Sequence, residues 1–350
     1  MPSLAEPTSR SPAHPARFFE REEDGRLLCT LCPRECRLGE GQAGFCYVRQ
    51  NQGGEMVSLA YGKSTGFAVD PIEKKPLYHF LPGTSVLSFG TVGCNLGCRF
   101  CQNWNISKAR ESGRGMASLT AEEVVALAES SGCPSIAFTY NDPVIWAEWA
   151  IDVAREARRR GIRTVFVTAG YVEEKAREEI FAFMDAANVD LKAFTEEFYA
   201  KVTLSHLAPV LETLEWLARE GRVWTEVTNL VIPGLNDDPG ETRRLAEWIG
   251  KHMGPDVPLH FSAFHPTWKM ADRPPTPPAT LTQARRIARE VGLRHVYTGN
   301  VHDKDGQSTL CPGCGQVLVV REWNAVRRNR LGPGGTCKGC GERIAGRFEG

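Results

Sequence analysis

Three cysteines that follow an expected strand form the arrangement in this sequence best suited to chemistry. Residues 86–92 are a short β-branched run, and Cys94, Cys98 and Cys101 come directly after it with the spacing C-x3-C-x2-C. A four-iron cluster normally takes four thiolates, so three thiolates leave one iron open to a substrate or cofactor. Structural zinc requires a closed set of four ligands. The alternatives are a zinc knuckle completed by a distant histidine, or loop cysteines that hold no metal.

The remaining cysteines fall mainly into two groups of four near the ends of the chain. The sequence has 12 cysteines, and Cys133 stands alone as an expected buried apolar side chain. The two complete groups are Cys29, Cys32, Cys36 and Cys46, and Cys311, Cys314, Cys337 and Cys340.

The two groups differ in how sharply their spacing predicts a metal. The later group is a pair of C-x2-C knuckles with a glycine after each second cysteine, which is typical of a zinc ribbon or a rubredoxin-like module, with zinc favoured. The earlier group has the spacing C-x2-C-x3-C-x9-C, which suits either closed zinc or an auxiliary iron–sulfur cluster.

Composition excludes several classes of protein. The 350 residues include 42 Lys+Arg and 42 Asp+Glu, so no chain-wide basic field exists for nucleic acid or for an anionic membrane. Residues 1–17 contain no apolar signal-peptide segment, and no run reaches the roughly 18 apolar residues of a membrane span. We therefore expect a cytoplasmic, reducing environment in which the cysteine groups hold metal rather than disulfides.

The middle of the chain alternates between strand-like and helix-like segments. Strands are expected at residues 86–92, 135–140, 163–168, 188–192, 223–232, 259–264 and 295–298, and helices at 120–131, 143–160, 173–186, 207–220, 239–253 and 280–291. This alternation predicts an α/β fold with a parallel sheet, as a partial or complete TIM-type (β/α) barrel. A doubly wound sheet is the structural alternative.

Five regions follow from this pattern. They are a disordered leader at 1–17, an N-terminal four-cysteine metal module at 18–50, a connecting arm at 51–85, the barrel core at 86–305 and a C-terminal zinc-ribbon or rubredoxin-like module at 306–350. The loops at the carboxyl ends of barrel strands carry the active site in this fold, and the three central cysteines lie on such a loop.

The central motif resembles the signature of the radical SAM superfamily, C-x3-C-x-Φ-C, in which Phe100 is the aromatic residue Φ. Residues 70–77, 101–104 and 231–237 are similar to the branch of the pyruvate formate-lyase activating enzymes. The flanking cysteine modules, with residues 298–302, are more specifically similar to the radical SAM enzyme of the AmmeMemoRadiSam system. The resemblance runs from about Cys29 to Arg347.

The resemblance implies both cofactors and chemistry. Cys94, Cys98 and Cys101 would hold a [4Fe-4S] cluster whose open iron binds S-adenosylmethionine (SAM). One electron from an external donor would then allow cleavage of SAM to methionine and a 5′-deoxyadenosyl radical, which abstracts hydrogen from a substrate.

The resemblance also implies further residues that contact the cofactor, and each has a structural alternative. Asn141 and Asp142 lie where relatives contact the methionine amine, although an Asp-Pro turn alone would explain Asp142. Asp190 and Lys192 alternate onto one face of a strand. Relatives use such a lysine near the SAM carboxylate and such an aspartate around a nearby cation, although a buried ion pair alone would explain both residues. His265 follows another strand and could instead be a structural hydrogen-bond donor.

Three functions follow from these patterns. The first is a radical SAM enzyme that acts on an unidentified substrate. The second is an activating enzyme that makes a glycyl radical on a partner protein. The third is a zinc-ribbon protein that binds nucleic acid, since seven Lys/Arg face three Asp/Glu in residues 311–350. We expect nucleic acid not to be a partner, because a binding module needs no barrel with an open cluster site.

Overall fold

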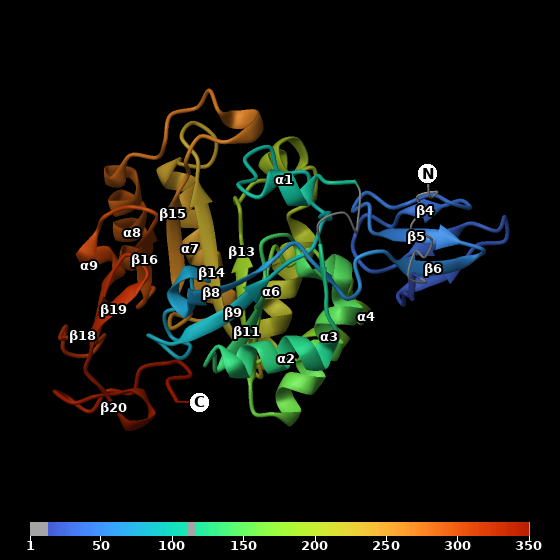
Figure 1. Ribbon diagram of the computed structural model, residues 1–350. Coiled ribbons are helices and arrows are strands. Elements are labelled where there is room, and N and C mark those ends of the chain that lie inside the picture. Colours follow the sequence, from blue (N-terminus) through green and yellow to red (C-terminus); the bar gives the residue numbers. More distant parts are fainter. Residues whose placement is uncertain (1–12, 111–115, 350) are drawn as a thin grey trace, which may run out of the picture.

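The computed structural model describes residues 13–110 and 116–349. An eight-stranded sheet forms its centre, in the order β16-β15-β14-β13-β12-β11-β9-β8 (Figure 1). Seven of these strands are parallel, and β8 (Phe67–Pro71) runs antiparallel to β9 (Ser85–Phe89) at one edge. Because β8 and β16 (Val296–Gly299) end the order, the sheet is an open, partial barrel.

The seven expected parallel strands and the six expected helices are all present. Between the two edges lie β11 (Ser135–Phe138), β12 (Arg163–Thr168), β13 (Ala186–Asp190), β14 (Trp224–Val231) and β15 (Leu259–Ala263). The long helices are α2 (Ala121–Ser130), α3 (Ala147–Arg159), α4 (Glu174–Phe181), α6 (Ala208–Glu220), α7 (Pro239–His252) and α8 (Pro278–Val291).

Short helical turns lie mostly in the loops of the barrel. They are α1 (Trp104–Ser107), α5 (Glu196–Phe198) and α9 (Lys304–Gln307), the 3₁₀ turns η1 (Ile72–Lys74), η2 (Pro143–Trp146), η4 (Trp268–Met270) and η5 (Pro333–Gly335), and the π-helical turn η3 (Tyr199–Thr203).

Local chemistry fixes where the helices begin and end. Thr120 and Glu123 form a capping box at the start of α2, and the Asp238 side chain caps α7. Helices α6 and α8 end at Gly221 and Gly292, both in the left-handed conformation that glycine adopts without strain.

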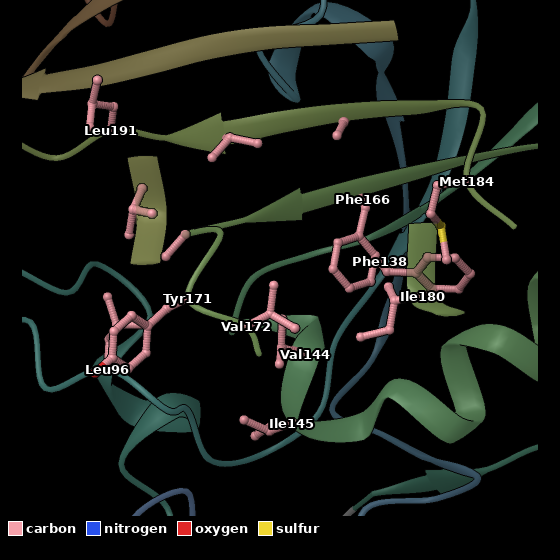
Figure 2. Packing of buried hydrophobic residues seen from close by; sticks show 14 of the residues in the cluster. Leu96, Phe138, Val144, Ile145, Phe166, Tyr171, Val172, Ile180, Met184 and Leu191 are labelled. Carbon is pink, nitrogen blue, oxygen red and sulfur yellow. The ribbon is translucent and has the colours of Figure 1, made fainter. Parts of the chain in front are cut away.

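The apolar core lies on both faces of the sheet. Between the sheet and its helices, Phe138 and Phe166 meet edge to face at 6.3 Å and lie near Ile180 and Met184 (Figure 2). On the inner face, Ile72, Leu77, Phe80 and Leu81 form a second cluster with strand residues of the barrel wall. The arm that precedes β9 therefore fills the lower interior of the open barrel.

The N-terminal module consists of two small three-stranded sheets. One contains β2 (Phe19–Arg21), β3 (Leu27–Cys29) and β4 (Arg37–Leu38), and the other β1 (His14–Pro15), β6 (Glu55–Ser58) and β5 (Arg49–Gln52). The strands β7 (Lys63–Ser64) and β10 (Ala117–Ser118) form a separate antiparallel pair.

Two expected boundaries need correction. Residues 1–12 of the expected leader lie outside the described residues, but His14–Pro15 pairs with β6 and Ala16 is buried, so residues 14–16 belong to the folded module. The boundary at residue 50 cuts the hairpin of β5 and β6, and the arm at 51–85 contributes β8 to the central sheet. Both errors come from pairing with partners distant in sequence, which local composition does not reveal.

The C-terminal module packs beside the barrel, on the opposite side of the sheet from the N-terminal module (Figure 1). It contains β17 (Thr309–Leu310), β18 (Val317–Glu322), β19 (Ala325–Asn329), β20 (Leu331–Gly332) and β21 (Thr336–Cys337). Arg321 is completely buried between this module and the arm, where it pairs with Glu73 at 3.5 Å. None of the described helices has both the length and the apolar composition to cross a bilayer.

Candidate active site

Two glycines shape the loop that carries the central cysteines. A Cβ atom at Gly90 would lie 2.3 Å from the Thr139 carbonyl oxygen, and one at Gly93 would lie 2.0 Å from the Cys46 carbonyl oxygen. Gly93 also has a φ of +84°. Both positions therefore require glycine, which lets the loop pass closely between β11 and the N-terminal module.

The three cysteines of this loop line one cavity of about 500 Å³ at the carboxyl ends of the strands. The Leu96 amide donates to Cys94 Sγ at 3.5 Å, and Ser107 Oγ lies 3.2 Å from Cys101 Sγ. Burial raises the pKa of the Cys98 thiol to about 12. A bound metal would stabilise the thiolate in this position.

Asn141 lies in the cavity wall, but its side chain is occupied within the fold. Its Oδ1 accepts from the Thr91 amide at 3.1 Å and from Trp146 Nε1 at 3.3 Å, and its Nδ2 donates to the Gly93 carbonyl at 2.9 Å. The amide therefore fastens the end of β11 to the cysteine loop.

Asp142 has a similar internal role. Its carboxylate accepts from Thr168 Oγ1 at 2.9 Å, from the Ala169 amide at 3.0 Å and from the Val144 amide at 3.2 Å. Burial raises the pKa of Asp142, and these donors partly offset the increase. Asp142 thus caps η2 and joins β11 to β12, while it also lines the cavity.

Asp190 and Lys192 enter the cavity together, as their strand alternation predicts. Lys192 Nζ donates to Asp190 Oδ2 at 2.9 Å and lies 5.7 Å from the centre of the Phe100 ring. Burial disfavours the charged amine, but Asp190 and Cys98 together raise the pKa of Lys192. The amine is therefore a fixed cation beside the cysteine loop.

The two histidines near β15 lie in different places. His265 is exposed, does not line the cavity, and contacts the Asn300 carbonyl at 3.3 Å. His260 is buried below the cavity, where its Nε2 lies 2.7 Å from Glu226. Glu226 also accepts from the His79 amide at 2.7 Å, so this layer anchors the arm inside the barrel.

Sequence reasoning missed a charged group on the wall formed by the arm. Asp70 accepts from Lys74 at 2.8 Å, from Lys75 at 2.7 Å and from the Tyr140 hydroxyl at 3.0 Å. Lys75 is 3 % exposed, and Tyr140 has the unusual φ of +72°. Both lysines and Tyr140 line the same cavity as the cysteines. The spacing Asp-x3-Lys-Lys and the tyrosine beside Asn141 were the available signals.

The C-terminal cysteines form a compact group. Within the described ranges, Cys311, Cys314, Cys337 and Cys340 are the one set of at least three possible metal ligands whose donor atoms all lie within 4.8 Å of one another. The Cys311–Cys340 and Cys314–Cys337 sulfur distances are 3.5 and 3.8 Å.

The N-terminal cysteines gather more loosely. Cys29, Cys32 and Cys46 are buried and Cys36 is half-buried. Cys32 lies close enough to the other three for their charges to interact. The fold thus brings all four expected ligands into one neighbourhood.

The residues around the central cavity fit a cluster with three protein ligands and a bound small molecule. Three thiols face the cavity, and its lining among the described residues contains neither a further cysteine nor a histidine. Its volume lies within the range of ligand pockets, roughly 300–1,000 Å³. The buried Thr228 hydroxyl in its wall has no hydrogen-bond partner among the described residues, so it is free to meet a ligand.

Comparisons with known proteins agree with this chemistry. Residues 89–246 match the family model of the radical SAM superfamily. A protein of Methanocaldococcus jannaschii, described as uncharacterised, is 42 % identical over 330 residues, which cover 94 % of this chain and 98 % of that protein.

Two activating enzymes match a smaller part of the chain. The pyruvate formate-lyase-activating enzyme of Clostridium pasteurianum is 27 % identical over 169 residues, covering 45 % of this chain and 66 % of that enzyme. The benzylsuccinate synthase activating enzyme of Thauera aromatica is 29 % identical over 125 residues, covering 35 % of this chain and 38 % of that enzyme.

Proposed function

Because the chain belongs to the radical SAM superfamily, in the branch of the pyruvate formate-lyase activating enzymes, we propose that Cys94, Cys98 and Cys101 hold its [4Fe-4S] cluster and that the adjoining cavity binds SAM. The observation that carries this assignment is the opening of all three thiols into one cavity at the carboxyl ends of the strands. When bound and reduced, the cluster supplies the electron that cleaves SAM to a 5′-deoxyadenosyl radical.

The charged residues of the cavity would orient SAM. Lys192 offers a fixed cation beside Cys98, suited to the carboxylate of the methionine moiety. Asp190 holds that amine through its 2.9 Å ion pair. Since Asn141 and Asp142 use their side chains to fix the loops, we assign them positioning roles, with backbone atoms left for SAM.

Apolar residues of the same wall would exclude water from the radical. Leu96, Phe100, Val167 and Leu230 line the cavity between the cysteine loop and the strands. His265 lies outside this lining, so we assign it no contact with SAM.

For the substrate we propose a protein segment, together with an external one-electron donor for the cluster. The support is that two relatives are named for the enzymes that they activate. Membership of an enzyme family does not favour the alternative of a zinc-ribbon protein that binds nucleic acid.

We further propose that both flanking modules, residues 14–58 and 306–350, bind metal around the barrel core. A tetrahedral zinc ion with Zn–S bonds of about 2.3 Å places its sulfurs about 3.8 Å apart. The C-terminal sulfur distances of 3.5 and 3.8 Å fit this geometry, which supports zinc in that module.

Anaerobic reconstitution tests the main proposal. The protein is loaded with iron and sulfide, reduced with dithionite and mixed with SAM, and 5′-deoxyadenosine is quantified by chromatography. We expect product from the wild type, none from Cys98→Ala, and undiminished product from the matched control Cys133→Ala. An intact cluster that yields no product, while a known radical SAM enzyme yields it in parallel, would overturn the proposal.

A further inference from the structure

The N-terminal module lies directly against the loop of the central cysteines. The Cys46 carbonyl packs on Gly93, where a Cβ atom would be only 2.0 Å from the oxygen. Arg34 of the same module donates from Nε to the Asn95 carbonyl, and its guanidinium carbon lies 3.5 Å from the centre of the Phe45 ring. The two cysteine-bearing segments therefore share a backbone contact one residue from Cys94.

The thiols of the two segments lie in one apolar core. Cys29, Cys32 and Cys46 belong to the same buried cluster as Leu96 and Cys98. Such surroundings exclude water and lower the local dielectric constant. They suit a redox centre better than a hydrolytic one.

The spacing of the thiols distinguishes the N-terminal group from the C-terminal group. A single tetrahedral metal ion holds its four sulfur ligands about 3.8 Å from one another. A four-iron cube binds each thiolate to a different iron atom and so holds the sulfur ligands farther apart. Among the described residues, neither the N-terminal four nor the central three form a set within 4.8 Å, unlike the C-terminal four. The N-terminal group thus shares the wider spacing of the central cysteines.

One N–H group of a buried arginine beside the N-terminal thiols lacks an acceptor among the described residues. Arg49 is 1 % exposed and pairs with Glu148 at 2.9 Å, while its charge acts on Cys29 and Cys46. Its Nε atom is buried and has no hydrogen-bond partner within the described part of the chain. Cluster sulfides or thiolates would accept this N–H.

We propose that Cys29, Cys32, Cys36 and Cys46 hold a second [4Fe-4S] cluster, which relays electrons to the cluster on Cys94, Cys98 and Cys101. The relay rests on the proposed function, whereas the identity of the metal does not. A reduced low-potential carrier protein gives one electron to the N-terminal cluster and is itself oxidised. The N-terminal cluster then passes that electron to the central cluster and returns to its oxidised state, and no proton or covalent bond changes.

Two short connections suit this relay. One runs from the Cys46 carbonyl through Gly93 to Cys94. The other involves the buried Tyr171, which interacts electrostatically with Cys32. The backbone carbonyl of Tyr171 accepts a hydrogen bond from Asn95 Nδ2 at 2.9 Å. Figure 2 shows Tyr171 beside Leu96 of the cysteine loop, in the common core.

Metal analysis of the full-length protein, purified anaerobically and reconstituted, tests the cluster. We expect about eight iron atoms and about one zinc ion per chain in the wild type, since two four-iron clusters and one zinc site are present. Cys36→Ser, at the least buried N-terminal cysteine, should lose about half of the iron and keep the electron paramagnetic resonance signal of the central cluster. Cys133→Ser is the matched control and should keep all of the iron.

A wild-type chain with about four iron atoms and two zinc ions would overturn the second cluster, and this result does not depend on whether Cys36→Ser folds. The relay is tested by reducing the central cluster with flavodoxin and, separately, with dithionite. In Cys36→Ser, we expect flavodoxin no longer to reduce the central cluster, while dithionite still reduces it. Equal losses of reduction with both reductants would overturn the relay. Eight iron atoms without 5′-deoxyadenosine would contradict the proposed function and the relay, but would support the second cluster.

Discussion

Replacing Gly93 by alanine places a methyl group where the backbone of the N-terminal module already lies. The new Cβ would stand 2.0 Å from the Cys46 carbonyl oxygen and 3.3 Å from Ile145 Cδ1. Real Cβ atoms stay at least 3.0 Å from such an atom, so the module or the cysteine loop must retreat by about 1 Å. The neighbouring Cys94 would move with the loop.

The expected loss of stability has two sources. Alanine in the left-handed region costs about 1–2 kcal/mol, and forced displacement of packed groups costs about 1–3 kcal/mol. The free energy of unfolding should therefore fall by about 2–5 kcal/mol. At an unfolding entropy of about 2.1 cal/mol/K per residue, Tm should fall by about 3–7 °C.

The control variant Gly132→Ala separates the cost of the left-handed backbone conformation from the cost of displacing packed groups. Gly132 has a φ of +65° and nothing within 4 Å of the position of its Cβ, so only the backbone penalty applies. Its Tm should fall by about 1–3 °C. A displacement of about 1 Å at Cys94 should also reduce 5′-deoxyadenosine formation roughly 100-fold in Gly93→Ala alone. Equal changes of Tm in scanning calorimetry and of product formation in the two variants would show that no steric clash acts at Gly93.

Three further predictions concern the cavity and its floor. Asp70→Asn should lower the free energy of unfolding by about 3–5 kcal/mol, since Lys75 would be buried without its carboxylate, and a loss below about 1 kcal/mol in thermal unfolding would contradict this. Lowering the pH from 7 to 4.5 should destabilise the fold by about 3 kcal/mol through His79, because burial lowers its pKa to about 3 while the unfolded residue binds a proton below about 6.5. Urea titrations should show a shallower pH dependence for His79→Gln. Lys192→Met should keep its iron but bind SAM roughly 10–100-fold more weakly in equilibrium dialysis, and unchanged binding would remove Lys192 from the site.

Local patterns predicted the barrel well because they report burial and periodicity. Each expected strand and helix of the core is present, and the alternation that places Asp190 and Lys192 on one face is confirmed by their ion pair. The cysteine spacing likewise predicted the compact C-terminal group.

Contacts between distant segments could not be predicted in the same way. Nothing in the composition of residues 67–71 indicates that they pair antiparallel with β9. A hydrophobic pattern indicates that a segment is buried, but it does not identify the segment that packs against it. The side chains of Asn141 and Asp142 are a similar case, because their hydrogen-bond partners come from neighbouring loops and strands. The contact of Cys46 with Gly93 depends on two segments meeting in space.

The burial of Arg321 has a consequence for the order of assembly during synthesis. Its guanidinium pairs with Glu73 and donates to the Tyr78 carbonyl, while the Arg347 carbonyl accepts from the Leu81 amide. A nascent chain that ends before these residues leaves the Glu73 carboxylate without its ion pair, and the Tyr78 carbonyl and the Leu81 amide without these hydrogen bonds. Residues that follow the whole barrel in the sequence therefore complete its floor. Insertion of iron into the barrel should therefore follow the synthesis of residues 321–347, and chains truncated after the core should reach the cluster-assembly machinery with an unfinished floor.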